Sequence, residues 1–263
     1  MKLRAVLFDL DDTLVPERSA WDAAFTSACA GVCSQYSIEV DDLRREVFKA
    51  ARELWQASPL IDWCRSVGFG VPSSLLSDFA GDGPELSYLR EWTPRYRREV
   101  WSIGLASVGL ADPMAPESLA LAFREAFSAG HAPFDDVIPA LDALGGYAFG
   151  VITNGESGLQ RDKLLRSGLS RYFPLVFISG EVRVAKPHSV IFRAALDKLG
   201  IAPNEAVMVG DNIDRDIAGA HALGLHPVWL DRANAAKAPT VPHLRIDSLA
   251  DLPSVVQRLS AWT

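Results

Sequence analysis

Three aspartates stand close together in the stretch FDLDDTLV, residues 8–15. Asp9, Asp11 and Asp12 directly follow the apolar run LRAVLF. Carboxylates about 4 Å apart repel one another, and burial at the end of an apolar segment increases the cost of that repulsion. Such a cluster persists only if a cation or hydrogen bonds neutralise it. The stretch therefore predicts a positively charged ligand that the sequence itself does not supply.

Further polar residues stand where later apolar runs end. They are Thr153, Asn154 and Gly155 after YAFGVI, Asp211, Asp214 and Asp216 after EAVMVG, and Lys186 just before Pro187. Taken singly, each has an ordinary structural explanation, because aspartates cap helices, Thr-Asn-Gly forms turns and lysines are solvated. Their joint occurrence at successive strand ends favours a shared function.

The types of these residues indicate the ligands that they suit. Carboxylates and a carbonyl without cysteine or histidine form a hard oxygen site, which suits Mg²⁺ better than zinc. The hydroxyl of Thr153, the backbone amides near Gly155 and the ammonium of Lys186 suit the oxygens of a phosphate. We therefore expect an anionic substrate that binds next to acidic residues through a metal ion.

The apolar runs predict the strands that position these residues. Continuous apolar runs are typical of strands covered on both faces in a parallel sheet, and they occur at 3–10, 147–153, 174–179, 205–211 and 226–231. Helical patterns that end in glycine alternate with them at 156–168, 188–200 and 216–224, and Pro187 is well placed to begin the second helix. The alternation predicts an α/β fold with a doubly wound, Rossmann-like parallel sheet, in which ligands bind at the carboxyl ends of the strands.

Residues from about 17 to about 135 break this alternation. Helical patterns follow one another there, at 19–36, 41–56, 85–109 and 116–130, with turn-rich breaks at 67–74 and 79–85. We therefore predict an inserted all-helical domain over 17–135 and a core formed by 1–16 and 136–263. Five of the seven tryptophans lie in the insertion, which favours a packed helical core, with an aromatic substrate pocket as the alternative.

Composition and charge restrict the classes of function. The chain has 263 residues, a net charge of −7 and no basic run, which argues against nucleic-acid or anionic-membrane binding. No apolar stretch reaches the roughly 20 residues of a membrane span, and the N-terminus lacks a secretory signal. Cys29, Cys33 and Cys64 lack metal-binding spacing, so we expect buried thiols in a reduced, cytoplasmic setting. Monomer and homodimer both remain open.

At these residues the sequence resembles the haloacid dehalogenase-like hydrolase superfamily. DLDDTL is similar to its first motif, VITNG to the second, the AKP that contains Lys186 to the third and GDNIDRDIAGA to the fourth. The four motifs in order span most of residues 3–231. The helical insertion resembles the superfamily's helical (C1-type) cap domain. The motif set is most similar to the branch of sugar-phosphate and nucleotide phosphatases.

The resemblance implies a role for each catalytic residue. Asp9 would attack phosphorus and become a phosphoaspartate. Asp11 would protonate the leaving alcohol and then activate water. Thr153 and Lys186 would stabilise charge on the transferring phosphoryl group. The implied phosphate-binding set is Asp9, Thr153, Asn154, Gly155 and Lys186.

The resemblance also implies a Mg²⁺ site. Asp9, the backbone carbonyl of Asp11 and Asp211 would bind the ion, and Asp216 would contribute through water or orient Lys186. The implied activity is a Mg²⁺-dependent phosphatase, a hydrolase that cleaves a small phosphomonoester such as a sugar phosphate or nucleotide. The expected partner is thus a small phosphorylated metabolite.

Other reactions of the superfamily stay in view as alternatives. Metal-independent 2-haloacid dehalogenases and phosphonatases lack the second aspartate, which here is Asp11, and Lys49 is the only lysine that the insertion offers for a phosphonatase Schiff base. A catalytically silent binding protein of the same fold would show a damaged motif, and none is visible. Mutase action and the physiological substrate are left open. Candidates for leaving-group contacts are Trp63, Arg65, Phe69, Tyr88 and Arg90, for which helical packing and solvation are the alternative explanations.

Overall fold

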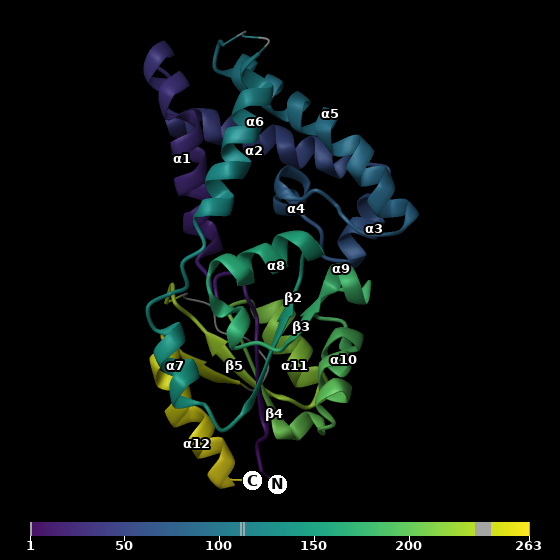
Figure 1. Ribbon diagram of the computed structural model, residues 1–263, viewed down its shortest axis with the longest axis vertical. Coiled ribbons are helices and arrows are strands. Elements are labelled where there is room, and N and C mark those ends of the chain that lie inside the picture. Colours follow the sequence, from purple (N-terminus) through teal and green to yellow (C-terminus); the bar gives the residue numbers. More distant parts are fainter. Residues whose placement is uncertain (1, 111, 113, 235–242, 263) are drawn as a thin grey trace. The chain divides into compact units, whose positions relative to one another are not determined.

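The computed structural model describes residues 2–110, 112, 114–234 and 243–262. Its contacts divide the chain into two compact units, which are described separately (Figure 1). An α/β unit comprises 1–16, 132–154 and 167–263, and a helical unit comprises 17–131 and 155–166. The helical unit therefore takes in a second segment, 155–166, that the domain limits expected from the sequence assign to the core. As limits of independently folding domains, 17–135 and the flanking core segments stay a prediction.

The α/β unit is built on a parallel sheet. Among the described residues the sheet has six strands in the order β3-β2-β1-β4-β5-β6. The strands are β1 (Ala5–Phe8), β2 (Ala148–Thr153), β3 (Leu175–Ile178), β4 (Ala206–Gly210), β5 (His226–Leu230) and β6 (Leu244–Ile246). Phe8 pairs with Val151 on one side and Val209 on the other, so β1, β2 and β4 end at the same edge. The predicted parallel sheet is confirmed.

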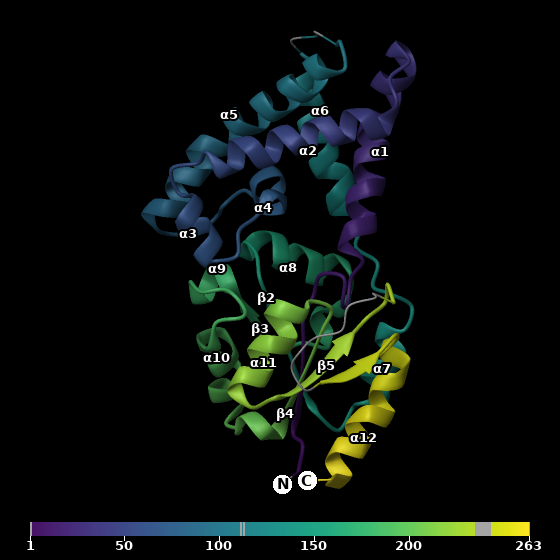
Figure 2. The ribbon, with the colours of Figure 1, turned by 180° about the vertical axis from the view of Figure 1, so that it is seen from behind.

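Helices cover both faces of this sheet, as Figure 1 and the reverse view in Figure 2 show. They are α7 (Val137–Ala143), α9 (Ser179–Val182), α10 (Ser189–Leu199), α11 (Ala218–Leu223) and α12 (Leu252–Trp262). On one face Ala5 and Leu7 of β1 pack with Phe192 of α10 in a single buried cluster. On the other face the ring of Phe8 lies 5.7 Å from that of Phe173. Burial on both faces explains why β1 is a continuous apolar run.

The start of α10 differs from the prediction. Pro187 does not open this helix, which begins at Ser189. The imidazole of His188 caps it instead, because Nδ1 accepts a hydrogen bond from the backbone N–H of Val190 at 3.3 Å. Pro187 lies one residue earlier and is joined to Lys186 by a cis peptide bond. The proline therefore belongs to the connection that carries Lys186.

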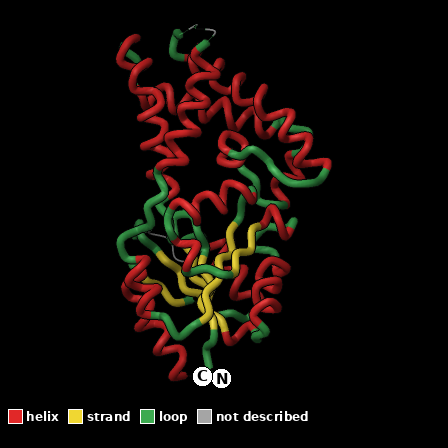
Figure 3. Tube along the Cα trace, viewed as in Figure 1, coloured by secondary structure: helices red, strands yellow, loops and turns green. Residues whose placement is uncertain are grey.

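The helical unit contains no strand among its described residues, as the red tube in Figure 3 shows. Its helices are α1 (Glu17–Tyr36), α2 (Val40–Gln56), α3 (Ile61–Ser66), α4 (Val71–Leu76), α5 (Pro84–Ser107), α6 (Ala115–Ala129) and α8 (Ser157–Arg166). The break predicted over 67–74 is partly wrong, because α4 forms there with Pro72 in its first turn. Aromatic rings fill the core, with Phe25 stacked on Trp101 at 5.4 Å. The predicted all-helical insertion with a packed core is confirmed.

Helix α8 joins the helical unit through specific contacts. Leu159 packs against the buried cluster of this unit. The ammonium of Lys163, which is 1% exposed, lies 2.6 Å from a carboxylate oxygen of Glu17 on α1. Ser128 of α6 donates a hydrogen bond to Asp162 at 3.4 Å. These contacts join residues far apart in sequence. The helical pattern over 156–168 alone therefore did not indicate that α8 belongs to the helical unit.

Two further expectations concern the helices and the cysteines. None of the helices in the described part of the chain is long and apolar enough to cross a bilayer. Cys29, Cys33 and Cys64 are buried free thiols of the helical unit, as predicted. Burial raises the pKa of Cys29 and of Cys64 to about 12, so both stay protonated at neutral pH.

Candidate active site

A tight loop follows β1 and carries the first aspartates. The backbone N–H of Asp9 donates to the carbonyl of Val209 on β4 at 2.9 Å, which fixes the end of the strand. Asp12 has a φ of 57° and donates its N–H to the carbonyl of Val15 at 2.7 Å. Asp11 and Val15 form an isolated bridge. The loop therefore closes on itself and holds Asp9 and Asp11 at the carboxyl edge of the sheet.

Lys186 binds two of the predicted site residues at once. Its ammonium lies 2.5 Å from a carboxylate oxygen of Asp9 and 2.7 Å from one of Asp216. It also donates to the carbonyl of Ile152, the residue before Thr153, at 2.7 Å. Lys186 is 4% exposed, so all three contacts lie in a medium of low dielectric constant. One cation thus connects the ends of β1 and β2 with the turn after β4.

Burial and charge shift the pKa of both partners in this cluster. Burial, together with the charges of Asp216, Asp211 and Asp11, raises the pKa of Asp9 well above its usual value, against the opposing effect of Lys186. Burial alone lowers the pKa of Lys186, but the charges of Asp216 and Asp9 outweigh it and raise that pKa overall. Lys186 is therefore a permanent cation. Three carboxyl groups, those of Asp9, Asp211 and Asp216, converge next to this one cation.

Asp9, Asp211 and Asp216 converge in a way that fits a metal ion. One carboxylate oxygen from each lies within 4.8 Å of the others. Lys186 lies near Oδ1 of Asp216, yet this oxygen has no aligned hydrogen-bond donor among the described residues. Oxygen ligands of this kind, with room for water, suit Mg²⁺. The residues present therefore fit the ion that their types predicted.

Gly210 makes the position of Asp216 possible. A Cβ atom at this glycine would lie 2.4 Å from the carboxyl carbon of Asp216, which is far closer than two carbons can approach. The side chain of Asp216, fully buried, also accepts the backbone N–H of Asn212 at 3.0 Å. Asp216 belongs to a π-helical turn, Ile213–Ile217, that leads into α11. The strand end and this turn pack together only because residue 210 has no side chain.

The backbone of Asp211 is fixed from both sides. Its N–H donates to the hydroxyl of Thr13 at 3.1 Å, and its carbonyl accepts the indole N–H of Trp229 at 3.1 Å. Arg232 in turn donates to the carbonyl of Thr13 at 3.0 Å and to both carboxylate oxygens of Asp136, at 2.8 and 2.9 Å. These contacts support the loop after β1 and the turn after β4 together. We call the Arg232–Asp136 pair the Asp136 clamp.

Asn154 positions Lys186. Its side-chain amide donates to the carbonyl of Lys186 at 3.0 Å and accepts the N–H of Lys186 at 2.8 Å. This pair of hydrogen bonds occupies the amide, so phosphate contact from Asn154 would come from its backbone N–H. Thr153 is fully buried, and Gly155 has a φ of 151°, which favours glycine.

Four of the five cap residues considered from the sequence have structural partners, and the fifth, Tyr88, is exposed. Phe69 is 3% exposed and packs edge-on against Trp63 at 5.5 Å. Arg90 donates to the carbonyls of Phe79 and Gly81. Arg65 pairs with Asp62 in an exposed ion pair at 3.3 Å. None of the five residues lines any of three cavities of the helical unit, whose volumes are about 590, 360 and 280 Å³.

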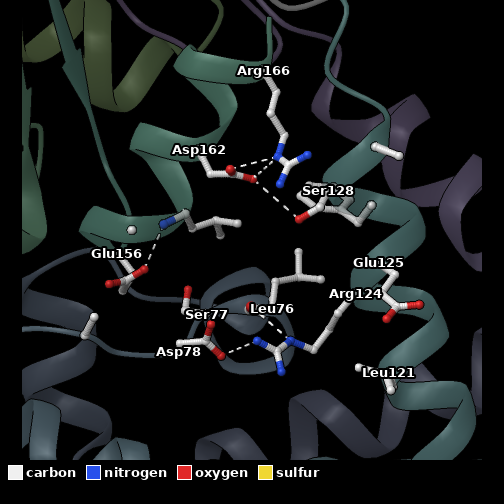
Figure 4. A pocket seen from close by; sticks show the side chains of 15 residues that line it. Leu76, Ser77, Asp78, Leu121, Arg124, Glu125, Ser128, Glu156, Asp162 and Arg166 are labelled. Atoms are coloured by element: carbon white, nitrogen blue, oxygen red, sulfur yellow. Dashed lines mark hydrogen bonds and ion pairs between the residues drawn. The ribbon is translucent and has the colours of Figure 1, made fainter.

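One such cavity, of about 590 Å³, lies between α6, α8 and the segment 76–80 (Figure 4). Its two arginines already hold carboxylates. Arg166 pairs with Asp162 at 2.7 Å, and Arg124 pairs with Asp78 and donates to the carbonyl of Leu76 at 3.3 Å. Glu156 caps α8 by accepting the N–H of Leu159 at 2.9 Å. The charges of this cavity are largely satisfied within it.

The family model described as "haloacid dehalogenase-like hydrolase" matches residues 3–224, a range that includes Asp9, Asp11, Lys186, Asp211 and Asp216. The chain belongs to the haloacid dehalogenase-like hydrolases. A phosphoserine phosphatase of Thermus thermophilus is 32% identical to this hydrolase over 95% of the chain and 98% of that protein. A glyceraldehyde 3-phosphate phosphatase of Methanopyrus kandleri is 28% identical over 98% of this chain and 99% of that protein. The homologues of this hydrolase are therefore phosphomonoesterases.

Solved structures share the fold of the hydrolase. The putative HAD-hydrolase YfnB from Bacillus subtilis, solved bound to magnesium, has a TM-score of 0.67, is 20% identical and covers 97% of this chain and 99% of its own. At that identity the likeness shows the fold alone. Structures of 2-haloacid dehalogenases also share it. The fold by itself therefore does not separate the two reactions.

Sequence reasoning named the acidic and basic residues but missed those that position them. The role of Gly210 could have been recognised from the sequence, because a glycine between a buried strand and an aspartate indicates close backbone packing. Trp229 and the Asp136 clamp could not be recognised, because they contact the site from distant parts of the chain. Thr13 lies in the first motif, but its contact with Asp211 joins residues far apart in sequence. Of the predicted residues, the structure brings Asp9, Lys186, Asp211 and Asp216 into one cluster.

Proposed function

We propose that this hydrolase is a Mg²⁺-dependent phosphatase that cleaves a small phosphomonoester through a phosphoaspartate on Asp9. The observation that carries the proposal is the cluster in which Lys186, Asp211 and Asp216 lie next to the buried Asp9. It provides a nucleophile next to charges suited to a phosphate. Both relatives described above match almost the whole chain and are named as phosphatases.

In the first step a carboxylate oxygen of Asp9 forms a bond to phosphorus while the bond from phosphorus to the ester oxygen breaks. Asp11 gives its proton to the leaving alkoxide, which departs as an alcohol. Lys186, held by Asn154, stabilises the nonbridging oxygens as charge shifts onto them. Thr153 and the backbone at Gly155 bind the same oxygens.

In the second step water attacks phosphorus of the phosphoaspartate, and Asp11 accepts the proton from that water. The bond between phosphorus and the oxygen of Asp9 breaks, which releases inorganic phosphate and restores the carboxylate of Asp9 and the protonated carboxyl group of Asp11. Asp9, the backbone carbonyl of Asp11, Asp211 and Asp216 would hold Mg²⁺. When bound, the ion neutralises charge between the acidic cluster and the phosphate.

The test measures inorganic phosphate release from sugar phosphates, nucleoside monophosphates, phosphorylated hydroxy and amino acids, and 4-nitrophenyl phosphate, with Mg²⁺ or with chelator. We expect turnover only with Mg²⁺, and its loss in Asp9→Asn. Asp197→Asn is the matched control, because Asp197 is an exposed aspartate of α10. It should keep full activity.

Two other outcomes would refute the proposal. Halide release from 2-chloropropionate in chelator, without phosphate release from any ester, would identify a dehalogenase. Binding of phosphate esters without turnover of any of them would identify a binding protein of the same fold. In either case Asp11 could not be the acid and base of a phosphatase.

A further inference from the structure

The carbonyl of Asp211 is bound by a residue of the neighbouring strand. Trp229 lies on β5, in register with Gly210 of β4, the residue before Asp211. Its indole N–H donates to the Asp211 carbonyl at 3.1 Å. Trp229 is 2% exposed, so solvent competes little for this hydrogen bond. The indole therefore ties the turn after β4 to the next strand of the sheet.

The ring of Trp229 is held in turn by the edge strand β6. Arg245 of β6 is its register partner, and the guanidinium of Arg245 lies 5.3 Å from the centre of the indole ring. The same guanidinium pairs with the buried carboxylate of Asp231 at 2.8 Å. The ring of His243 lies edge-on to the indole at 5.9 Å. These contacts fix the direction in which the indole N–H points.

The three carboxylates of the candidate metal site are fixed in different ways. Asp9 and Asp216 are buried, and both pair with Lys186, at 2.5 and 2.7 Å. Asp211 is only partly buried. Hydrogen bonds to its N–H and to its carbonyl hold its main chain on both sides of the Cα atom. The position of the Asp211 carboxylate therefore depends on how firmly this backbone is held.

Mg²⁺ and Ca²⁺ differ in the precision that they require of such ligands. Mg²⁺ takes oxygen ligands at about 2.0–2.1 Å in nearly ideal octahedral geometry. Ca²⁺ takes about six to eight oxygen ligands at about 2.3–2.6 Å in variable arrangements. A carboxylate that loses its fixed position therefore lowers the affinity for Mg²⁺ more than the affinity for Ca²⁺.

We infer that Trp229 is a positioning residue for the metal ligand Asp211 and that its hydrogen bond favours Mg²⁺ over Ca²⁺ at this site. The inference rests on the metal site of the proposed phosphatase and adds a residue that selects the ion. Without the indole N–H, water would bind the Asp211 carbonyl but would not tie it to β5. Asp9 and Asp216 would keep their positions through Lys186.

The test titrates the metal-free protein with MgCl₂ and with CaCl₂ by calorimetry. Trp229→Phe keeps an aromatic ring and removes the indole N–H. We expect the Kd for Mg²⁺ to rise about tenfold and the Kd for Ca²⁺ to rise less than about threefold. Trp55→Phe is the matched control, because Trp55 is buried and its Nε1 has no hydrogen-bond partner among the described residues. It should change neither Kd.

Turnover gives a second measurement that partial unfolding would not imitate. With 4-nitrophenyl phosphate, Trp229→Phe should raise the Mg²⁺ concentration for half-maximal phosphate release about tenfold. The kcat at saturating Mg²⁺ should stay within about twofold of the wild-type value, because Trp229 acts through Asp211 and not on the reacting atoms. Partial unfolding would instead lower kcat at every Mg²⁺ concentration.

A second variant tests the same hydrogen bond from the surface. The side chain of Arg245 is 38% exposed, and Arg245→Gln keeps a donor for Asp231 while it removes the guanidinium from the indole ring. A cation–π contact at such a site changes an equilibrium constant about two- to fivefold, so the Kd for Mg²⁺ should rise by that factor and the Kd for Ca²⁺ should not. If Trp229→Phe does not fold, Arg245→Gln decides by the same comparison.

The outcomes separate this inference from the proposed function. If the wild type binds Mg²⁺ but Trp229→Phe leaves that Kd within about twofold, or raises both Kd values equally, the inference is overturned and the phosphatase is unaffected. If the wild type binds Mg²⁺ but hydrolyses no ester, the phosphatase fails, and calorimetry still decides the role of Trp229. A wild type that binds no Mg²⁺ would overturn both.

Discussion

The ammonium of Lys186 is the only cation found next to the buried carboxylates of Asp9 and Asp216 among the residues described. Breaking a buried ion pair by removing one partner leaves a charge without compensation. We expect Lys186→Met to lower the free energy of unfolding by about 2–4 kcal/mol in chelator, measured with urea. Lys198→Met, at an exposed position of α10, is the control. A decrease in the free energy of unfolding of less than about 1 kcal/mol would show that proton uptake by Asp9 compensates for the missing charge of Lys186.

Gly210 offers a second test at the scale of one residue. Alanine there would place a Cβ atom 2.4 Å from the carboxyl carbon of Asp216, so the aspartate must move. We expect Gly210→Ala to weaken Mg²⁺ binding measured by calorimetry and to cost about 1–3 kcal/mol of stability. Gly146→Ala is the matched control, because nothing lies within 4 Å of its added Cβ. Unchanged Mg²⁺ affinity in Gly210→Ala would remove Asp216 from the metal site.

At the scale of elements, the Asp136 clamp joins three connections of the α/β unit. Asp136 opens α7 and accepts from Arg232, from the hydroxyl of Ser248 at 2.6 Å and from the N–H of Leu249 at 2.9 Å. Burial by itself raises the pKa of Asp136, but the hydrogen bonds from Arg232, Ser248 and Leu249 outweigh it and lower that pKa overall. The ionised carboxylate therefore stabilises the folded state.

The lowered pKa of Asp136 fixes the direction of a pH dependence. Its stabilisation is complete above the unfolded pKa of about 4 and is lost as the pH falls through the lower folded pKa. Asp136→Asn should therefore be less stable than the wild type above about pH 5, and the difference should shrink below about pH 4. Urea unfolding of both proteins from pH 3 to 7 measures this difference in stability. A difference that grows on acidification would contradict this assignment.

Helices α2 and α5 approach closely at Gly104. A Cβ atom there would lie 2.4 Å from a methyl carbon of Val47 and 3.0 Å from its Cα. We expect Gly104→Ala to destabilise the helical unit by about 1–3 kcal/mol, because the backbones of α2 and α5 would have to move apart. Gly31→Ala is the matched change, since its Cβ on α1 would meet nothing within 4 Å and alanine favours helix by about 1 kcal/mol. Equal effects of the two changes would contradict the packing argument.

The fold was predictable where the signal was local. Continuous apolar runs placed β1 and β4 correctly because both are buried along their whole length. The helix at Val71–Leu76 was missed because glycine and serine in 67–74 indicate turns, and its buried leucines stabilise it only through tertiary packing. In the site, Lys186 and the aspartates were recognisable by type. Gly155–Arg166 joins the helical unit through contacts that no local pattern encodes.

At the scale of the whole molecule, thiol chemistry reports on the helical unit alone, because all three cysteines lie in it. Burial raises the pKa of Cys29 and Cys64 to about 12, so their thiolate populations are very small at pH 8. We expect both to react with an aromatic disulfide reagent only when this unit opens. Labelling should therefore accelerate in Gly104→Ala and not in Gly146→Ala. Rapid labelling of the native wild type would contradict their burial.

The buried ion pair of Lys163 and Glu17 limits how the helical unit can be transplanted between related enzymes. The chain enters the helical unit twice, at Glu17 and at Gly155, and this pair joins the two segments at 2.6 Å. A chimera that transplants only 17–131 from a relative would place a foreign residue opposite the host's Lys163. The buried ammonium of Lys163 would then lack a carboxylate partner. A transplant that carries 155–166 as well keeps the donor's own partners together. Transplanting the helical unit between members of this family therefore requires two grafts, and the second, though short, decides whether the first is tolerated.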